Sequence, residues 1–175
     1  MKAKRLIQGA AAALIGVGSL AAHAEGLYVG GALGGPHYND PVNGIAGSGS
    51  GTAGKVFGGV QVNPNFGVEA GIFDLGHIDD ANGKVDLRGL YLDAVGKVEF
   101  APNWSLTGSA GVADGRFKTS SGNDHSPALK LGVGVEYAMT RNASLDVGYD
   151  HYRFSDAFDG KANVSMPFVG VKVGF

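Results

Sequence analysis

Cysteine is absent from the 175-residue sequence, and charged residues are scarce. No disulfide can therefore hold the fold together. Charged residues make up 17% of the chain, below the roughly 25% usual for soluble domains, whereas glycine occurs 31 times. Basic residues (14) are outnumbered by acidic ones (16). We expect no nucleic-acid partner, because such a partner calls for a clustered basic face.

Long apolar runs are confined to the start of the chain. The basic start KAKR precedes an apolar segment over residues 6–22, which ends on the small residues AHA at 22–24. This layout is typical of a cleavable secretory signal peptide. We therefore assign residues 1–24 to a signal peptide and residues 25–175 to one exported domain.

The exported part lacks the patterns of helices. Beyond residue 24 there is no run of about 18 apolar residues, the length needed for a transmembrane helix, and no convincing 3.6-residue periodicity. A charge-poor, glycine-rich chain can still enter a membrane as a closed β-barrel, which satisfies every backbone polar group internally. The composition therefore favours an all-β fold in a membrane.

Apolar residues alternate with small or charged ones along most of the exported part, which is the period of β-strands. Between Ala128 and Met139 every odd position is apolar, whereas the even positions are Ala, Gly, Lys or Glu. We predict eight such strands, over residues 26–35, 52–62, 65–76, 84–100, 103–117, 127–139, 143–155 and 161–175.

The connections between these segments alternate in length. Short turns are predicted near residues 63–64, 101–103 and 140–142. Long loops are predicted over residues 36–50, 77–83, 118–126 and 156–160. Short periplasmic turns and longer outer loops are typical of an outer-membrane barrel. The sequence therefore predicts an eight-stranded antiparallel up-and-down transmembrane β-barrel with both termini in the periplasm.

The apolar face of each strand could meet lipid or could fill the interior of a soluble barrel. The opposite face is mostly Gly, Ala and Ser, with too few charges to solvate an exterior. Aromatic residues of the apolar face lie beside a short turn or at the C-terminus, where membrane-interface aromatics are expected. These are Phe66, Phe100, Trp104, Tyr137 and Phe175. We therefore expect the apolar face to meet lipid.

One predicted strand breaks the alternation. Apolar residues occupy even positions from Leu90 to Phe100, but Val85 and Leu87 have the opposite parity. A β-bulge near Gly89, or a strand end that projects beyond the bilayer, would explain the change.

Three stretches resemble the OmpA-like eight-stranded outer-membrane barrels: NPNFGVEAGIFDLG (63–76), VGVEYAMTRNASLDVGYDHYRF (133–154) and the closing VGVKVGF (169–175). The resemblance implies insertion into the outer membrane of a Gram-negative cell envelope by the assembly machinery, which reads the last strand through Gly170, Val173 and Phe175. Phe168 departs from this signal, because a polar residue is commoner there. OmpA itself continues into a peptidoglycan-binding domain, so we expect a barrel-only member.

If the apolar face meets lipid, the other face places charged and polar side chains inside the barrel. The expected interior network consists of Lys55, Glu69, Asp93, Lys97, Glu99, Lys130, Glu136, Asp146 and Lys172, together with Gln61 and Asp150. Eight strands leave an interior just wide enough for side chains to fill, so these charges must pair. The pairs could form a structural plug. Alternatively, as proposed for the family, they could gate a narrow channel, with Glu69, Lys97, Lys130 and Glu136 as its candidates.

Other motifs are weaker indications of a binding or catalytic site. GSGSGTAGK (47–55) resembles a phosphate-binding loop but lacks the required Ser or Thr after the lysine. His151 and Ser155 suggest a hydrolase, yet four residues of strand span about 13 Å, so only a neighbouring strand could complete a site. We expect His37, His77 and His125 to be scattered over different loops, so no shared metal site is predicted. Asp-rich turns near residues 79–83 and 156–160 leave loose binding of divalent cations open.

We therefore expect an outer-membrane barrel with a structural role that displays surface loops, in contact with membrane lipid and lipopolysaccharide. The alternatives are a small, low-conductance porin-like channel and, less favoured, a lipid-modifying enzyme. We predict no catalytic, cofactor or metal site, and the sequence does not indicate a ligand for the loops.

Overall fold

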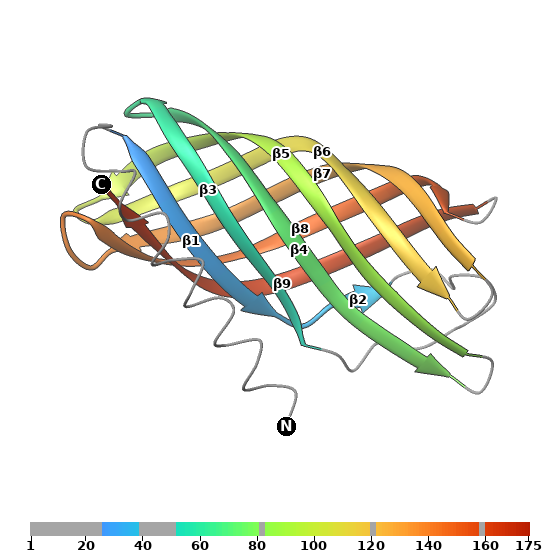
Figure 1. Ribbon diagram of the computed structural model, residues 1–175. Helices are drawn as coiled ribbons and strands as arrows, with labels where there is room; N and C mark the ends of the chain where they lie inside the picture. The colour runs from blue at the N-terminus through green and yellow to red at the C-terminus, as the bar shows by residue number, and fades with distance from the viewer. Residues whose placement is uncertain (1–25, 39–51, 81–82, 120–121, 158–159) are drawn as a thin grey trace.

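The computed structural model describes residues 26–38, 52–80, 83–119, 122–157 and 160–175, all of which belong to one β-barrel and its connections (Figure 1). The strands are β1 (Leu27–Gly34), β2 (His37–Tyr38), β3 (Ala53–Asn63), β4 (Phe66–Asp80), β5 (Gly83–Ala101), β6 (Trp104–Thr119), β7 (Gly122–Ala138), β8 (Ala143–Ala157) and β9 (Gly160–Gly174). In the described ranges no helix is long and apolar enough to span a bilayer.

The sheet closes on itself because β1 pairs with both β3 and β9. The short strand β2 continues the β1–β9 pairing in the same register, from Gly34 opposite Phe168 to His37 opposite Ser165. We therefore treat β1 and β2 as one barrel strand, interrupted at Gly35 and Pro36, since proline has no N–H to donate to the ladder. The predicted eight-stranded antiparallel barrel is confirmed.

The two ends of the barrel differ in their connections. We call the end where β1 begins and β9 finishes the terminal end, and the opposite one the loop end (Figure 1). Tight turns join the strands at the terminal end, and polar side chains stabilise them. The Thr140 hydroxyl accepts a hydrogen bond from the Ala143 N–H at 2.9 Å, and the Asn63 side-chain oxygen accepts one from the Phe66 N–H at 2.9 Å.

Three of the four predicted long loops are wrong, because strands occupy most of them. β4 extends to Asp80 and β5 begins at Gly83, and the β6–β7 and β8–β9 hairpins extend in the same way. Hydrophobic alternation disappears where both faces of a strand are polar, but the backbone ladder needs no apolar residues to continue. The connecting residues 81–82, 120–121 and 158–159, and most of the predicted loop 36–50, lie outside the described residues.

Of the two explanations offered for the change of parity in β5, the bulge near Gly89 is wrong. The β5–β6 register passes through Gly89 without a break, whereas the β4–β5 register shifts between Asp74 and His77. The irregularity therefore belongs to β4. Leu87 keeps the inward parity and is 1% exposed, because the interior at the loop end is apolar.

The two faces of the barrel wall have opposite polarity. On β7, Leu131 points outward and is 48% exposed, whereas the preceding Lys130 points inward and is 1% exposed. Most large apolar side chains of the other strands are exposed in the same way. A wall that is apolar outside and ionic inside is stable only if the outside meets hydrocarbon.

Inward-facing glycines make room for aromatic rings. A Cβ added at Gly59 would lie 2.3 Å from the ring of Tyr28, its direct cross-strand partner, and one at Gly71 would lie 2.7 Å from the ring of Tyr91. The same relation holds for the cross-strand pairs Gly30–Phe57, Gly89–Phe73 and Gly148–Phe168. These contacts explain why a narrow barrel with large internal rings is rich in glycine.

An apolar core fills the interior at the loop end. Leu75, Leu87, Tyr152, Phe154 and Met166 are each less than 2% exposed. The rings of Tyr152 and Phe154 are stacked with centroids 6.5 Å apart, and Tyr152 also contacts Phe73 at 5.0 Å. The barrel interior is thus divided into an apolar part at the loop end and an ionic part nearer the terminal end.

Candidate functional site: the charged barrel interior

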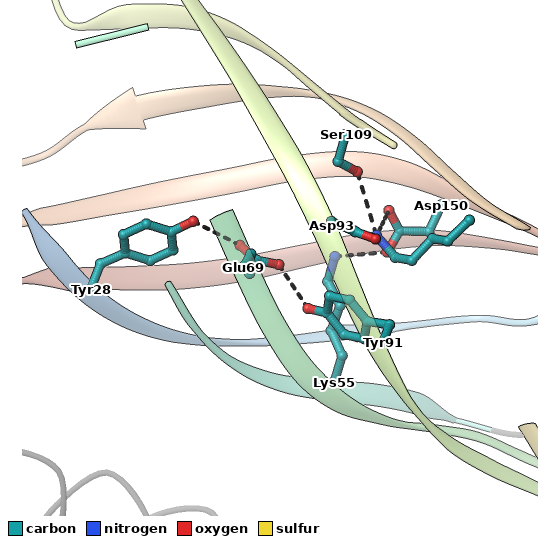
Figure 2. A network of polar contacts seen from close by, with 8 residues as sticks. Tyr28, Lys55, Glu69, Tyr91, Asp93, Ser109 and Asp150 are labelled. Carbon is teal, nitrogen blue, oxygen red and sulfur yellow. Dashed lines mark hydrogen bonds and ion pairs between the residues drawn. The ribbon is translucent and has the colours of Figure 1, made fainter. Parts of the chain in front are cut away.

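A cluster of four charged side chains crosses the middle of the barrel (Figure 2). Lys130 of β7 forms an ion pair with Asp93 of β5, and its Nζ lies 3.3 Å from Asp150 Oδ1 on β8. The other oxygen of Asp150 accepts a hydrogen bond of 2.7 Å from Lys55 Nζ on β3. All four side chains are at least nine-tenths buried. Asp150 therefore links the two lysines, and the cluster ties four strands together.

Glu69 is held by hydroxyl groups. Tyr91 Oη donates a hydrogen bond of 2.7 Å to Glu69 Oε1, and Tyr28 Oη donates one of 3.3 Å to Oε2 (Figure 2). Glu69 is 7% exposed. Two hydroxyl donors, one for each oxygen, compensate part of the desolvation of this carboxylate.

A second ionic cluster lies nearer the terminal end. The two oxygens of Glu136 accept hydrogen bonds of 2.7 Å from Lys97 Nζ and from Lys172 Nζ. The Lys172 ammonium also lies 5.0 Å from the ring centre of Tyr28. A cavity of about 220 Å³ opens at the terminal end and reaches all three charged groups. Water can therefore approach this cluster from one side.

Asp146 lies between the two clusters. Its side chain is buried, and within the described part of the barrel its Oδ1 has no hydrogen-bond partner. It lines a cavity of about 30 Å³, together with Lys55 and Lys172. A cavity of this size can hold a water molecule. Two lysines at the same cavity place positive charge near this carboxylate.

Glu99 and Gln61 do not belong to this interior network. Glu99 is exposed near the β5–β6 turn, at the terminal end of its strand, where the barrel wall no longer encloses it. Gln61 donates a hydrogen bond of 3.0 Å from Nε2 to the carbonyl oxygen of Pro64 and so stabilises the β3–β4 turn. The alternation of residues along a strand places both side chains on the inner face, but it does not show how far along the barrel axis each of them lies.

Phe168 has a place in the ionic network that sequence analysis did not predict. Its ring lies 3.7 Å from the Lys55 ammonium, measured to the ring centre, and Tyr91 lies at 4.7 Å from the Lys130 ammonium. Cations over aromatic faces are stabilised electrostatically, more so when desolvated. The alternation of residues along β9 and β5 places Phe168 and Tyr91 on the inner face. Which lysine each ring contacts depends on the register between strands, which the sequence does not show.

This arrangement resists the passage of ions. An ion entering from the terminal end would meet the Glu136 cluster, then the buried cluster of Lys130 and Asp150, and finally the apolar core at the loop end. Moving an unpaired charge into an apolar, water-free region is strongly unfavourable. An ion that crossed the described part of the interior would therefore have to displace paired charges and apolar side chains.

The structure shows one histidine–serine contact that a hydrolase would need, but the serine is buried. His151 Nδ1 lies 3.0 Å from Ser165 Oγ on β9, which is the neighbouring-strand partner that the sequence left open. Ser165 is 1% exposed, so a substrate cannot reach its hydroxyl. Of the phosphate-loop motif, residues 47–51 lie outside the described part and Lys55 points into the barrel. Among the described residues no group of three metal-ligating side chains occurs.

Aromatic side chains surround the terminal end on the outer face. Phe66, Phe100, Trp104 and Phe175 are between 42% and 62% exposed, and the Tyr137 ring packs on Trp104 with centroids 4.8 Å apart. From these aromatic side chains toward the loop end, the outer face is apolar for most of each strand. Such an aromatic ring at the edge of an apolar band is the pattern of a membrane–water interface.

The family model described as outer membrane protein beta-barrel domain matches residues 10–175 of this chain. The chain belongs to this family. Membership agrees with the apolar outer wall and places the family's barrel in the outer membrane. Among curated proteins, none matches this sequence.

Solved structures of the same architecture support the fold. Neisserial surface protein A is 20% identical, with a TM-score of 0.68 over 86% of this chain and 98% of that one. The N-terminal β-barrel domain of Pseudomonas aeruginosa OprF is 16% identical, with a TM-score of 0.59 over 87% and 100%. Pseudomonas aeruginosa OprG is 13% identical, with a TM-score of 0.53 over 87% and 97%. At these identities the likeness concerns the fold alone.

Proposed function

We propose that this protein is a structural component of the outer membrane, a barrel that displays the hairpins of its loop end at the cell surface. The signal peptide at residues 1–24 would direct export and would then be cleaved, and both termini of the barrel would lie in the periplasm. The observation that carries the proposal is an apolar outer wall around an interior that ion pairs and an apolar core fill over the described residues. Such a body is suited to residing in a bilayer and presenting its ends, and it offers no route for solutes.

We further propose that the barrel contacts outer-membrane lipid and lipopolysaccharide, and that the assembly machinery reads its last strand. β9 closes the barrel against β1, and the Phe175 N–H donates to the Leu27 carbonyl at 2.9 Å. Gly170 allows β9 to lie close to β1, because a Cβ at this position would lie 2.7 Å from the Cβ of Ala32. We infer a non-enzymatic role, because the Ser165 hydroxyl beside His151 is shielded.

An epitope insertion tests which end faces outward. A short tag placed at the β6–β7 connection, residues 120–121, is expected to bind antibody on intact cells. The same tag placed at the β7–β8 turn, residues 140–142, is expected to bind only after the outer membrane is permeabilised, because that turn lies at the terminal end. Both tagged proteins should remain heat-modifiable on gels, which controls for folding. Antibody binding to the second tag on intact cells would contradict the orientation.

A small channel is the second candidate, and one observation favours it. Asp150 contacts both Lys55 and Lys130, so either lysine could keep this carboxylate while the other moves. The cavity of about 220 Å³ already brings water to Glu136 from the terminal end. Exchange of ion pairs, together with displacement of the apolar core, would open a path.

Planar-bilayer recordings separate the two functions. The refolded protein is expected to give no openings above the background of the bilayer, because apolar side chains fill the loop end. Lys130→Gln is expected to remain silent if the cluster is a plug, and to raise conductance if it is a gate. Arg141→Gln is the control, since it removes an exposed cation from the β7–β8 turn, outside the barrel interior.

A further inference from the structure

The charges on the inner face of the barrel do not balance. Among the described residues, five carboxylates point inward against four lysines. The carboxylates are Glu69, Asp93, Glu136, Asp146 and Asp150, and the lysines are Lys55, Lys97, Lys130 and Lys172. An uncompensated charge in a protein interior is strongly unfavourable. One carboxylate therefore has to take up a positive charge that none of these side chains supplies.

Hydrogen-bond donors identify this carboxylate as Asp146. Glu69 accepts bonds from two tyrosine hydroxyls, and the other three carboxylates each accept at least one from a lysine ammonium. Within the described part of the barrel, Asp146 Oδ1 has no hydrogen-bond partner, although the residue is only 9% exposed. Burial without a donor is costly for an ionised group. Asp146 is therefore the member of this set whose negative charge lacks compensation.

The neighbour of Asp146 on β7 adds a charge of the same sign. Asp146 and Glu136 are direct cross-strand partners, and both are buried on the inner face. The two oxygens of Glu136 accept hydrogen bonds of 2.7 Å from Lys97 and Lys172, which hold Glu136 in its ionised form. Like charges directly opposite each other destabilise a sheet, and two adjoining carboxyl groups resist being ionised together. A neutral Asp146 would remove this repulsion.

The charged groups around the small cavity at Asp146 are engaged elsewhere. They are Lys55, Glu69, Lys130, Asp150 and Lys172. All three ammonium groups already form ion pairs with other carboxylates, and both acidic side chains have donors of their own. A metal ion at Asp146 would stand beside three ammonium groups, in a space of about 30 Å³ that holds one water molecule. A proton bound to the carboxylate needs no such space.

We propose that Asp146 is a proton-binding site and is a neutral carboxylic acid at neutral pH. The proton comes from water at the terminal end, where the cavity of about 220 Å³ opens. Val95, Thr107 and Lys172 line both this cavity and the inner one, so the two cavities adjoin. The protonated carboxyl can donate a hydrogen bond to a water molecule in the inner cavity. The inference is independent of which end of the barrel faces the cell surface.

The proton also affects the pairing of Lys172. With Asp146 neutral, Lys172 stays with Glu136, where its Nζ lies 2.7 Å from Oε2. If the proton were lost, Asp146 would become a second carboxylate that attracts this lysine from the inner side. Proton binding therefore holds the cluster of Lys97, Glu136 and Lys172 in its present arrangement.

Infrared spectroscopy tests the assignment. The protein is refolded at neutral pH in a detergent without carbonyl groups, and the C=O stretching band of protonated carboxyl groups is recorded in ordinary and in heavy water, which shifts it. Wild type is expected to show this band, and D146N is expected to lose it. Glu99→Gln, which removes an exposed carboxyl at the terminal end, should keep it. Absence of the band from wild type, or its persistence in D146N, overturns the site.

Denaturant titration gives a second readout. The folded protein would hold one proton more than the unfolded chain, in which aspartate is ionised above about pH 4, so stability falls as the pH rises. Between pH 5 and pH 7 the unfolding equilibrium constant of wild type is expected to rise about tenfold per pH unit relative to that of D146N. The histidines and the other carboxylates are common to both proteins and cancel in this ratio. An equal pH dependence of the two proteins overturns proton binding.

Two further outcomes are decisive. D146N is expected to fold and to remain heat-modifiable on gels, because an amide matches a neutral carboxyl group in size and charge. A D146N protein that cannot fold would show that the ionised form is needed, and overturns the proposal. Replacing sodium with choline at equal ionic strength should leave the stability of wild type unchanged. A loss of stability seen in wild type and absent from D146N would assign the site to a metal ion instead.

Discussion

Replacing Lys130 with methionine is expected to lower the free energy of unfolding by about 3–5 kcal/mol, as found when one partner of a buried ion pair is removed. Methionine nearly preserves the volume but leaves Asp93 and Asp150 without this shared cation. Asp93 is 1% and Asp150 2% exposed, so water cannot replace the lysine. Lys55 can still pair with Asp150, but it contacts Oδ2, whereas Lys130 contacts Oδ1.

Denaturant titration of the protein refolded in vesicles measures this loss. Trp104, the only tryptophan, lies in the aromatic ring at the terminal end and reports on transfer from the interface to water. Lys97→Met is the matched control: the Lys97 side chain is 33% exposed, and Glu136 keeps its contact with Lys172 at 2.7 Å. We expect a clearly smaller loss for it. D93N/K130M should recover part of the stability lost in K130M. Equal losses in K130M and K97M would argue against a sealed central cluster.

Replacing Val133 with arginine is expected to lower the free energy of unfolding by about 2–4 kcal/mol, because this is the magnitude for a cation on the lipid face at the bilayer midplane. Val133 is 56% exposed and lies in the middle of the outward row of β7, which runs from Tyr137 to Leu129. Its cross-strand partners are Gly108 and Tyr149, so no carboxylate directly opposite it can pair with the new charge. The guanidinium would have to reach an interface or draw water into the hydrocarbon.

Val62→Arg is the control for this substitution. Val62 is 69% exposed and lies next to the β3–β4 turn at the terminal end, where a lipid-facing charge costs about 0–1 kcal/mol. Both variants add the same side chain to an exposed valine of a strand, so the difference between their unfolding free energies isolates depth in the bilayer. If the two variants lose the same small amount, the outer wall does not face hydrocarbon.

Local patterns were sufficient to predict the barrel. Alternation in segments such as residues 128–139 requires one apolar face, and the scarcity of charge leaves too few polar side chains to cover an exterior in water. Turn residues such as Asn63 and Thr140 mark the places where strands reverse. The pattern failed at residues 77–83 and 118–126, because strands beyond the apolar band are paired by backbone hydrogen bonds that leave no hydrophobic periodicity.

The interior was predicted as a set of residues and not as a site. Parity placed Lys55, Asp93 and Lys130 on the inner face, where the structure has them, but it also placed Glu99 there, which lies exposed at the barrel end. The partners of Glu69 were missed because they are tyrosine hydroxyls from other strands, at separations of 41 and 22 residues. A pairing across the barrel depends on strand tilt and register, which a single strand does not encode.

The amino-acid sequence by itself determined which side of the wall is apolar, how many strands cross, and which face of each strand points inward. These properties follow from periodicity and composition, which act within one strand. Only the tertiary structure decided that Asp150 joins two lysines, that rings lie over glycines, and that apolar side chains fill the interior at the loop end. Each of these depends on distances between residues remote in the chain, and closure of the sheet is the event that sets those distances.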